Sequence, residues 1–584
     1  MNININLLKI NSVKNKVVLI PSVIILSSIV SFVLYFFVND YRTNALLEKS
    51  PETILAQMTL EEKVGQILHV GIRGKTPDVY TIHDIGKLHA GGVILFAANL
   101  GDKESIKKLN SDLQTLSMQS SGIPLFISID QEGGRIARIP EESSPGAMAM
   151  GQTENPFYAE EVGFFTAYSL KKLGFNMNLA PVLDVNNNPD NPVINTRSFG
   201  SSPDLVASMG IAHAKGIREA LVVPVIKHFP GHGDTNTDSH LDLPQINKSF
   251  EELEKMELIP FRKSIEEGAE ALMSAHILFP ALDGEMPATL SPKIIRGILR
   301  DKLKYDGLVM TDAMEMHAIS KRYRPEDSAK KAFLAGADII LLTTTGPVTD
   351  RIYNSLLDAF KKGELSESDL DRSVLRQISL KHKYGYFHSL DSKYANKDLK
   401  DYFSGQDERI EKRILHLSGK YKKPGLYDTV AKDGIRSLRK DYTLPSLQKN
   451  KNVQFYYTTK KMKDLALKSG IPEEDIMPFR SYLILRDLRK KDFEKHLILE
   501  VNDLNLRQWN QIVKKTAENV KAEQSNSALI ALYSGNPFLD ILIPDNGAVL
   551  ASFSPTDESI QALLETIFEK KVVGKADILL HVNK

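Results

Sequence analysis

The stretch VVPVIKHFPGHGDTNTDSHLDLP (residues 222–244) joins an apolar run to a long polar loop. VVPVI has the length and composition of a buried β-strand, and Lys227 and His228 follow it directly. The Pro-Gly and His-Gly pairs that come next disfavour a helix. The stretch therefore predicts a buried strand whose C-terminal end opens into a loop with polar side chains.

Seven further apolar runs lie between residues 51 and 390, and each is followed by a segment with helical spacing. The runs begin at Gln66, Gly92, Pro124, Phe175, Glu270, Gly307 and Ala337. Strands that alternate with helices are typical of a parallel α/β fold. Eight of them are compatible with a (β/α)8 TIM-type barrel or with an open, doubly wound sheet.

Polar residues at the ends of these runs favour the barrel. They follow five of the predicted strands directly, and they are Asp130, Asp184, Lys227 with His228, His276 and Asp312. The C-terminal strand ends of a barrel form one rim, and barrel enzymes assemble their sites there from different strands. We therefore expect a catalytic barrel over residues 51–390.

The rest of the chain predicts a second domain and a membrane anchor. Charged, polar sequence over residues 391–423 is typical of a linker, and apolar runs return in residues 424–584, where we expect a smaller α/β sandwich domain. Residues 17–38 are uncharged and apolar over about the 20 residues that a transmembrane helix needs.

Lysines in residues 1–16 favour a cytoplasmic N-terminus, so the catalytic domain would lie on the exported side, periplasmic or extracellular. A cleaved signal peptide is the alternative, but the apolar run is longer than is usual and no A-x-A-like cleavage site follows it.

Composition excludes several classes of function. The 584 residues carry a formal net charge of +1, so we expect no nucleic-acid partner. The chain has no cysteine, which excludes disulfides, thiolate metal sites and a cysteine nucleophile. The oligomeric state stays open.

The loop after the strand at residues 222–229 allows three interpretations. Its polar groups could bond only to each other, could bind a metal, or could transfer protons; the candidate ligands are His228, His232, Asp234, Asp238 and His240. The set lacks the helical H-E-x-x-H spacing, so no metal or other cofactor is expected. In Asp238-Ser239-His240 a carboxylate stands two residues from an imidazole, as an acid/base pair requires, and Asp312 is a candidate nucleophile.

The sequence KHFPGHGDTNTDSH from Lys227 resembles the signature loop of the glycoside hydrolase family 3 β-N-acetylglucosaminidases. DQEGGRIAR from Asp130, NTRSFG from Asn195 and VMTDAMEM from Val309 resemble the sugar-binding segment, the arginine loop and the nucleophile strand of that family. The likeness covers roughly residues 52–385, and ALYSGNP from Ala531 resembles the second domain of the two-domain members. Gly133 and Gly134 are expected to form a tight turn.

The resemblance implies a retaining exo-β-N-acetylglucosaminidase that removes terminal GlcNAc from peptidoglycan fragments. It implies Asp312 as the nucleophile, His240 as the acid/base and Asp238 as the residue that orients His240. The sugar would be bound by five residues, namely Asp130, Arg138, Arg197, Lys227 and His228. A covalent glycosyl-enzyme on a carboxylate agrees with retention of configuration.

Other functions remain possible at this point. A histidine acid/base does not repel phosphate, so a GlcNAc phosphorylase is one alternative. A β-glucosidase-type hydrolase, a metal-dependent barrel hydrolase and a wall-binding protein without activity are the others.

Overall fold

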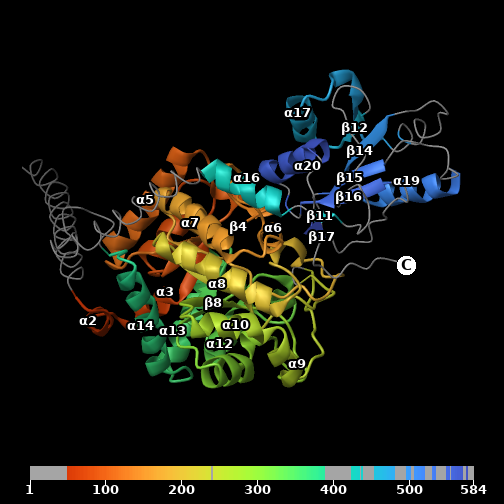
Figure 1. Ribbon diagram of the computed structural model, residues 1–584. Helices are drawn as coiled ribbons and strands as arrows, with labels where there is room; N and C mark the ends of the chain where they lie inside the picture. Colours follow the sequence, from red (N-terminus) through yellow and green to blue (C-terminus); the bar gives the residue numbers. More distant parts are fainter. Residues whose placement is uncertain are drawn as a thin grey trace, which may run out of the picture.

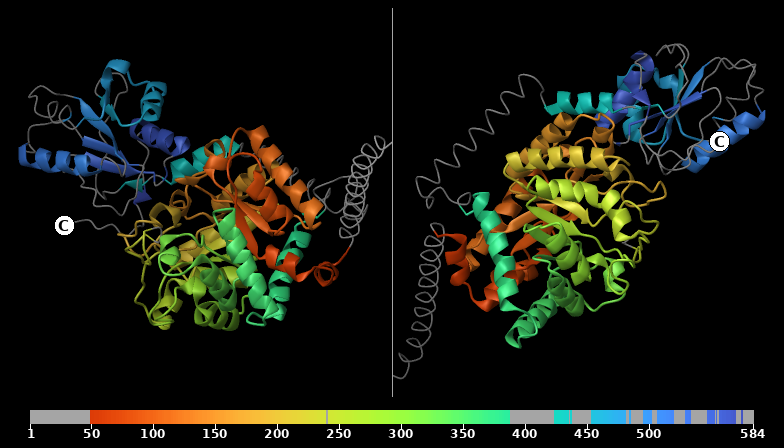
Figure 2. Two further views of the ribbon diagram at one scale, coloured as in Figure 1. Left: turned by 180° about the vertical axis from the view of Figure 1, so that it is seen from behind. Right: turned by 60° about the horizontal axis from the view of Figure 1, so that its bottom comes forward.

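The computed structural model describes two regular regions of the chain. The residues described are 49–238, 241–387, 423–434, 436–437, 453–480, 484, 495–501, 506–519, 529–533, 547–552, 554, 556–569 and 574–575. The first region contains an eight-stranded sheet and the second a seven-stranded sheet. Figures 1 and 2 show them side by side, with helix α16 (Lys423–Asp433) next to the first region.

The eight-stranded sheet is a nearly closed parallel barrel in the order β10-β1-β2-β3-β6-β7-β8-β9. A parallel bridge between Met310 and Ile339 connects the two ends of this order. The strands are β1 (Leu68–Gly71), β2 (Gly92–Leu95), β3 (Phe126–Ile129), β6 (Met177–Asn178), β7 (Val223–Phe229), β8 (Ala271–Ser274), β9 (Leu308–Thr311) and β10 (Ile340–Leu341). Each of the eight predicted runs contains one of them, so the TIM-type barrel is confirmed and the open sheet is wrong.

Side chains alternate between the inside and the outside of the barrel, as a strand period of two requires. On β8, Ala271 and Met273 belong to the interior cluster, whereas Leu272 packs outward against the helices. Leu308 and Met310 on β9 also point inward. The barrel centre is therefore a packed core and not a pore.

Helices surround the barrel, and several of them begin with a capping side chain. Thr59 and Glu62 form a capping box at the start of α3, and Ser249 and Glu252 form another at α9. The helices of this region are α2 (Pro51–Ala56), α3 (Leu60–Gln66), α4 (Val79–Gly86), α5 (Lys103–Ser120), α6 (Ala147–Gly151), α7 (Pro156–Lys172), α8 (Pro203–Glu219), α9 (Phe250–Lys255), α10 (Leu258–Glu266), α11 (His317–Ser320), α12 (Pro325–Ala335), α13 (Pro347–Lys361) and α14 (Glu367–Lys383).

Short elements lie on the loops between strands and helices. A two-stranded hairpin of β4 (Gln131–Gly133) and β5 (Ile136–Ala137) follows β3. Gly133 and Gly134 have φ values of 89° and 57°, so the predicted tight turn is confirmed. The one-turn and π-type helices are η1 (Ala97–Asn99), η2 (Pro140–Glu142), η3 (Asn195–Arg197), η4 (Ala288–Leu290) and η5 (Lys293–Lys302).

The second region has a mixed sheet in the order β13-β12-β14-β15-β16-β11-β17, with hydrophobic clusters on both faces. Its strands are β11 (Arg436–Ser437), β12 (Val453–Tyr457), β13 (Ile476–Pro478), β14 (His496–Val501), β15 (Leu529–Tyr533), β16 (Gly547–Ala551) and β17 (Gly574–Lys575). Its helices are α17 (Lys460–Lys468), α19 (Leu506–Asn519), α20 (Asp557–Glu569) and the one-turn η6 (Glu473–Asp475). The predicted linker boundaries stay a prediction, because residues 388–422 lie outside the described residues.

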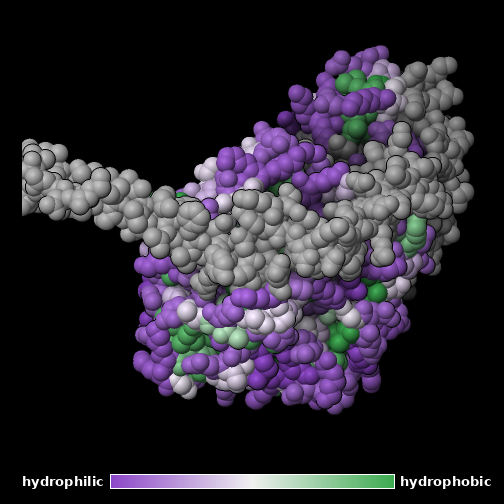
Figure 3. Space-filling view, turned by 90° about the vertical axis from the view of Figure 1, so that its left-hand side faces the viewer, coloured by the Kyte–Doolittle hydropathy of each residue, from purple (hydrophilic) through white to green (hydrophobic). Residues whose placement is uncertain are grey.

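The described part of the chain contains no helix that is both long and apolar enough to cross a bilayer. The predicted anchor, residues 17–38, lies outside that part. Figure 3 shows one face of the molecule, where the coloured surface is mostly hydrophilic and the hydrophobic areas are small and separate.

Candidate active site

A cavity of about 610 Å³ lies at the C-terminal ends of the barrel strands. Six of the eight predicted site residues line it, namely Asp130, Arg138, Arg197, Lys227, His228 and Asp312. The apolar side chains of Ile94, Met273 and Leu341 come from the strands β2, β8 and β10. The rim predicted from the sequence thus brings together charged groups from distant parts of the chain.

The other two predicted residues are on the loop after β7. Asp238 is not among the residues that line the cavity, and its carbonyl oxygen accepts hydrogen bonds from the amides of Leu241 and Asp242. His240 lies outside the described residues. The loop is fastened just beyond it, because Lys321 Nζ donates to Leu241 O at 2.6 Å and Arg322 pairs with Asp242 at 2.8 Å.

Glu132 occupies the centre of a buried ionic cluster. Its carboxylate accepts two hydrogen bonds from Arg197, at 2.9 and 2.8 Å, and lies 2.7 Å from Lys227 Nζ. Burial favours a neutral Glu132, but the charges of Arg197 and Lys227 outweigh this effect and hold the pKa of Glu132 far below its usual value. Glu132 is therefore ionised and fixes both cations in place.

Lys227 and Arg138 also hold Asp130. Lys227 Nζ donates to Asp130 Oδ1 at 2.8 Å, and Arg138 Nη2 donates to Asp130 Oδ2 at 3.3 Å. Burial alone would lower the pKa of Lys227, but Asp130 and Glu132 raise it above its usual value. The Arg138 Nε atom is buried and has no hydrogen-bond partner among the described residues. The cluster thus offers fixed donors and an acceptor, as recognition of sugar hydroxyls requires.

His228 is oriented by Asp184, which follows β6. Asp184 Oδ2 lies 2.7 Å from His228 Nδ1, and Asp184 Oδ1 accepts from the backbone amides of His228 and His232. Burial raises the pKa of Asp184, but His228 and His232 together lower it more, so the carboxyl is ionised. An ionised carboxylate can only accept, so Nδ1 of His228 carries a proton. His232, which is also buried, has a pKa lowered to about 4 by burial and by the charge of His228.

Asp312 follows β9 and lies at the wall of the cavity opposite β3. One carboxylate oxygen accepts from the Ala313 amide at 2.7 Å. Burial raises the pKa of Asp312, but His276, His228, that amide and Lys227 together hold it below its ordinary value. An ionised carboxylate that faces a cavity has the charge state that a nucleophile needs.

His276 lies behind Asp312 and is buried. Its Nδ1 is 2.9 Å from Thr289 Oγ1, and its Nε2 is 2.9 Å from Ala313 O. Since a carbonyl oxygen only accepts, Nε2 carries the proton. Burial lowers the pKa of His276. His276 is thus a bonded core histidine that also fixes the backbone next to Asp312.

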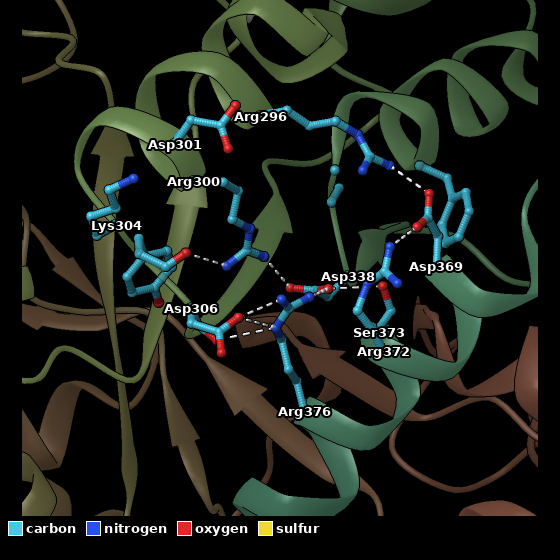
Figure 4. A pocket seen from close by; sticks show the side chains of 14 residues that line it. Arg296, Arg300, Asp301, Lys304, Asp306, Asp338, Asp369, Arg372, Ser373 and Arg376 are labelled. Atoms are coloured by element: carbon cyan, nitrogen blue, oxygen red, sulfur yellow. Dashed lines mark hydrogen bonds and ion pairs between the residues drawn. The ribbon is translucent and has the colours of Figure 1, made fainter.

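Figure 4 shows a second cavity, of about 560 Å³. Its lining residues Asp306 and Asp338 precede β9 and β10, so it lies at the opposite end of the barrel. Its arginines are already paired with carboxylates: Arg300 and Arg376 contact Asp338 at 2.7 and 3.0 Å, and Arg296 contacts Asp369 at 3.0 Å. These pairs join η5 and α14 to the base of β10. We assign this cavity to the ionic framework of the barrel, because Arg296, Arg300 and Arg376 already pair with Asp338 and Asp369.

Sequence reasoning missed three site residues, and the signals for them differ. The strand pattern places Asp184 on the rim but does not show that it is the partner of His228. The sequence suggests His232 only as a candidate metal ligand. Glu132 follows Asp130 by two residues in a predicted turn, where an acid is usually exposed. Its burial between Arg197 and Lys227 depends on contacts that no local pattern reveals.

Comparison with known proteins agrees with this geometry. The glycosyl hydrolase family 3 N-terminal domain matches residues 59–380. Beta-hexosaminidase A of Pseudoalteromonas piscicida is 39% identical over 328 residues, which cover 51% of this chain but only 54% of that protein. Beta-hexosaminidase LpqI of Mycobacterium tuberculosis is 33% identical over 340 residues, 57% of this chain and 85% of that protein.

A solved structure covers both regions. The glycoside hydrolase family 3 beta-N-acetylglucosaminidase from Paenibacillus sp. str. FPU-7 has 30% sequence identity and a TM-score of 0.75, over 89% of this chain and 98% of that chain. The family match spans the barrel that carries the cavity. The chain therefore belongs to glycosyl hydrolase family 3 and is a glycoside hydrolase of the β-hexosaminidase type.

Proposed function

We propose that the protein is a retaining exo-β-N-acetylglucosaminidase with Asp312 as its nucleophile. The observation that carries this proposal is the ionised Asp312 carboxylate, which faces a cavity of about 610 Å³ lined by a fixed set of hydrogen-bond donors. Attack of this carboxylate on the anomeric carbon forms a glycosyl-enzyme, and water then cleaves it with overall retention. The beta-hexosaminidase relatives support N-acetylhexosamine as the sugar.

The ionic cluster opposite Asp312 binds the sugar in this proposal. Asp130 accepts hydrogen bonds from hydroxyl groups, while Arg138, Arg197, Lys227 and His228 donate to hydroxyl or N-acetyl oxygens. Their mutual pairing fixes these groups before the substrate arrives, so little ordering is needed on binding.

His240 is the proposed acid/base, oriented by Asp238. The imidazole protonates the leaving oxygen in the first step and takes a proton from water in the second. The course of the loop supports this role, because Leu241 and Asp242 are bound to Lys321 and Arg322 just after α11. Helix α11 follows Asp312, and His317 at its start lines the cavity.

The natural substrate is proposed to be GlcNAc-containing peptidoglycan fragments, processed during wall recycling on the exported side of the membrane. This part of the proposal rests on the resemblance of the loop from Lys227 to the wall-recycling enzymes and on the apolar residues 17–38. A membrane anchor would hold the enzyme where such fragments are released.

The test compares 4-nitrophenyl β-glycosides of GlcNAc and glucose, with wild type and Asp312→Asn. We expect release from the GlcNAc glycoside, a β-anomer as first product by proton NMR, and loss of turnover in the variant. An α-anomer would exclude retention, and preference for the glucoside would exclude the hexosaminidase assignment. GlcNAc 1-phosphate as the main product in phosphate buffer would replace hydrolysis by phosphorolysis.

A further inference from the structure

Two loops that carry proposed sugar-binding residues rest on one segment, residues 144–151. The β4–β5 hairpin, which contains Glu132, contacts the start of this segment: the Gly134 amide donates to Ser144 O at 2.8 Å. A Cβ atom on Gly134 would lie 2.8 Å from the Cα atom of Gly146. The two backbones are therefore in direct contact, with no room for a side chain between them.

The end of the same segment supports the arginine loop. A Cβ atom on Gly151, the last residue of α6, would lie 1.7 Å from the carbonyl oxygen of Phe199. Phe199 is two residues beyond Arg197, which ends η3. The position of α6 thus determines the position of the loop that delivers Arg197 to Glu132.

The second region of the chain holds the segment from its other side. Met148 is fully buried in a hydrophobic cluster whose other members all come from residues 456–551, among them Tyr456, Leu499 and Trp509. The Gly146 amide donates to Ser554 Oγ at 3.2 Å. Figure 1 shows α6 and β4 on the side of the barrel that faces β11 and β17.

We propose that the second region is a positioning element for the sugar-binding half of the active site, and that it acts through Met148 and Ser554. It clamps residues 144–151 and so sets the distance between the hairpin with Glu132 and the loop with Arg197. Their bidentate contact tolerates little movement, since two parallel hydrogen bonds between a guanidinium and a carboxylate require one relative orientation. The inference deepens the proposed function and rests on it.

The barrel geometry predicts which kinetic constant changes. The hairpin follows β3, whereas Asp312 follows β9, which is four strands from β3 in either direction around the barrel. Displacement of residues 144–151 should weaken contacts that bind the substrate and the transition state equally. It should leave the nucleophile Asp312 in place. Loss of such uniform binding raises KM and changes kcat little.

The experiment uses the full chain and 4-nitrophenyl N-acetyl-β-glucosaminide. We compare wild type with Met148→Ala, Met148→Leu and Ser554→Ala. The control is Met462→Ala, which removes the same atoms from a buried methionine of the second region that belongs to a different cluster, without Met148. Each variant is characterised by kcat, KM, the inhibition constant of GlcNAc and thermal unfolding.

We expect Met148→Ala to raise KM and the GlcNAc inhibition constant together by about tenfold, with kcat changed less than about twofold. Ser554→Ala should raise both constants by a smaller factor. Met148→Leu should keep wild-type values of both, because leucine fills about the same volume as methionine. Met462→Ala should leave both constants unchanged.

Two results would overturn the inference: unchanged KM in Met148→Ala and Ser554→Ala, or an equal rise of KM in Met462→Ala. Ser554→Ala removes a single hydroxyl, so it still tests the inference if Met148→Ala does not fold. A wild type that releases no GlcNAc would instead refute the proposed function.

Discussion

Replacing Glu132 by glutamine tests the ionic cluster with almost no change in shape. The carboxylate is 6% exposed and binds Arg197 through two hydrogen bonds and Lys227 at 2.7 Å. The amide of glutamine has one accepting oxygen instead of two and no charge, so two buried cations lose their shared counter-ion. Removing one partner from such a group costs about 3–5 kcal/mol of unfolding free energy.

The matched control is Glu160→Gln. Glu160 pairs with Lys215 at 3.0 Å, and the lysine side chain is 55% exposed. A pair of this kind contributes only about 0–1 kcal/mol. Urea unfolding at pH 7 should therefore show a large loss of stability for Glu132→Gln and a small one for Glu160→Gln, and KM should rise in the first variant alone.

The stability difference between wild type and Glu132→Gln should also depend on pH. The folded pKa of Glu132 lies below its unfolded value of about 4.3. Its contribution is thus fully present above that value and is lost as the pH falls toward the folded pKa. Two results would refute the assignment of an ionised, shared carboxylate. One is equal stability of wild type and Glu132→Gln at pH 7, and the other is a stability difference between these two proteins that stays constant down to about pH 3.

Three further predictions concern other groups. Asp312→Asn should lower turnover by about 10⁴-fold or more on activated and natural substrates alike, because no nucleophile remains, and steady-state rates on both would reveal any residual activity. His240→Ala should slow substrates with poor leaving groups far more than 4-nitrophenyl glycosides; equal losses would exclude His240 as the acid. Burial lowers the pKa of Lys381 to about 7, so the stability of wild type relative to Lys381→Met should rise between about pH 7 and pH 10. A difference in melting temperature between the two proteins that does not change over this pH range would contradict this.

The barrel could be predicted because parallel strands buried on both faces are continuous apolar runs. The lengths of the individual strands could not be predicted. The run that begins at Phe175 gives only Met177–Asn178 as a strand. Pro181 has no amide hydrogen to donate, and the Asn178 carbonyl already accepts from the amide of Ala180, so the regular ladder is interrupted there, although the carbonyls of Ala180 and Pro181 still accept from the amides of Val225 and Lys227.

The rim position of most site residues was also accessible from sequence, since it depends only on which residue follows a strand. Asp130, Lys227, His228 and Asp312 meet in one cavity for this reason, whereas Arg138 and Arg197 follow no predicted strand and were expected there only from the resemblance to the family. The pairing within the cavity was not accessible: Glu132 meets Arg197, 65 residues further along, through the fold of two loops. The sequence does not distinguish a buried acid in a turn from an exposed one, because its partners come from distant parts of the chain.

The proposed sugar-binding groups and the proposed nucleophile lie in different halves of the barrel. The half around β3 carries a cluster of paired charges that is fixed before any substrate binds and is braced by residues 144–151. The half around β9 carries Asp312, whose charge is maintained by His276, His228, the Ala313 amide and Lys227. Preformed pairing lowers the entropic cost of binding, whereas an ionised nucleophile acts only when the anomeric carbon gains positive charge. Variants of the first half should therefore change KM, and variants of the second half should change kcat.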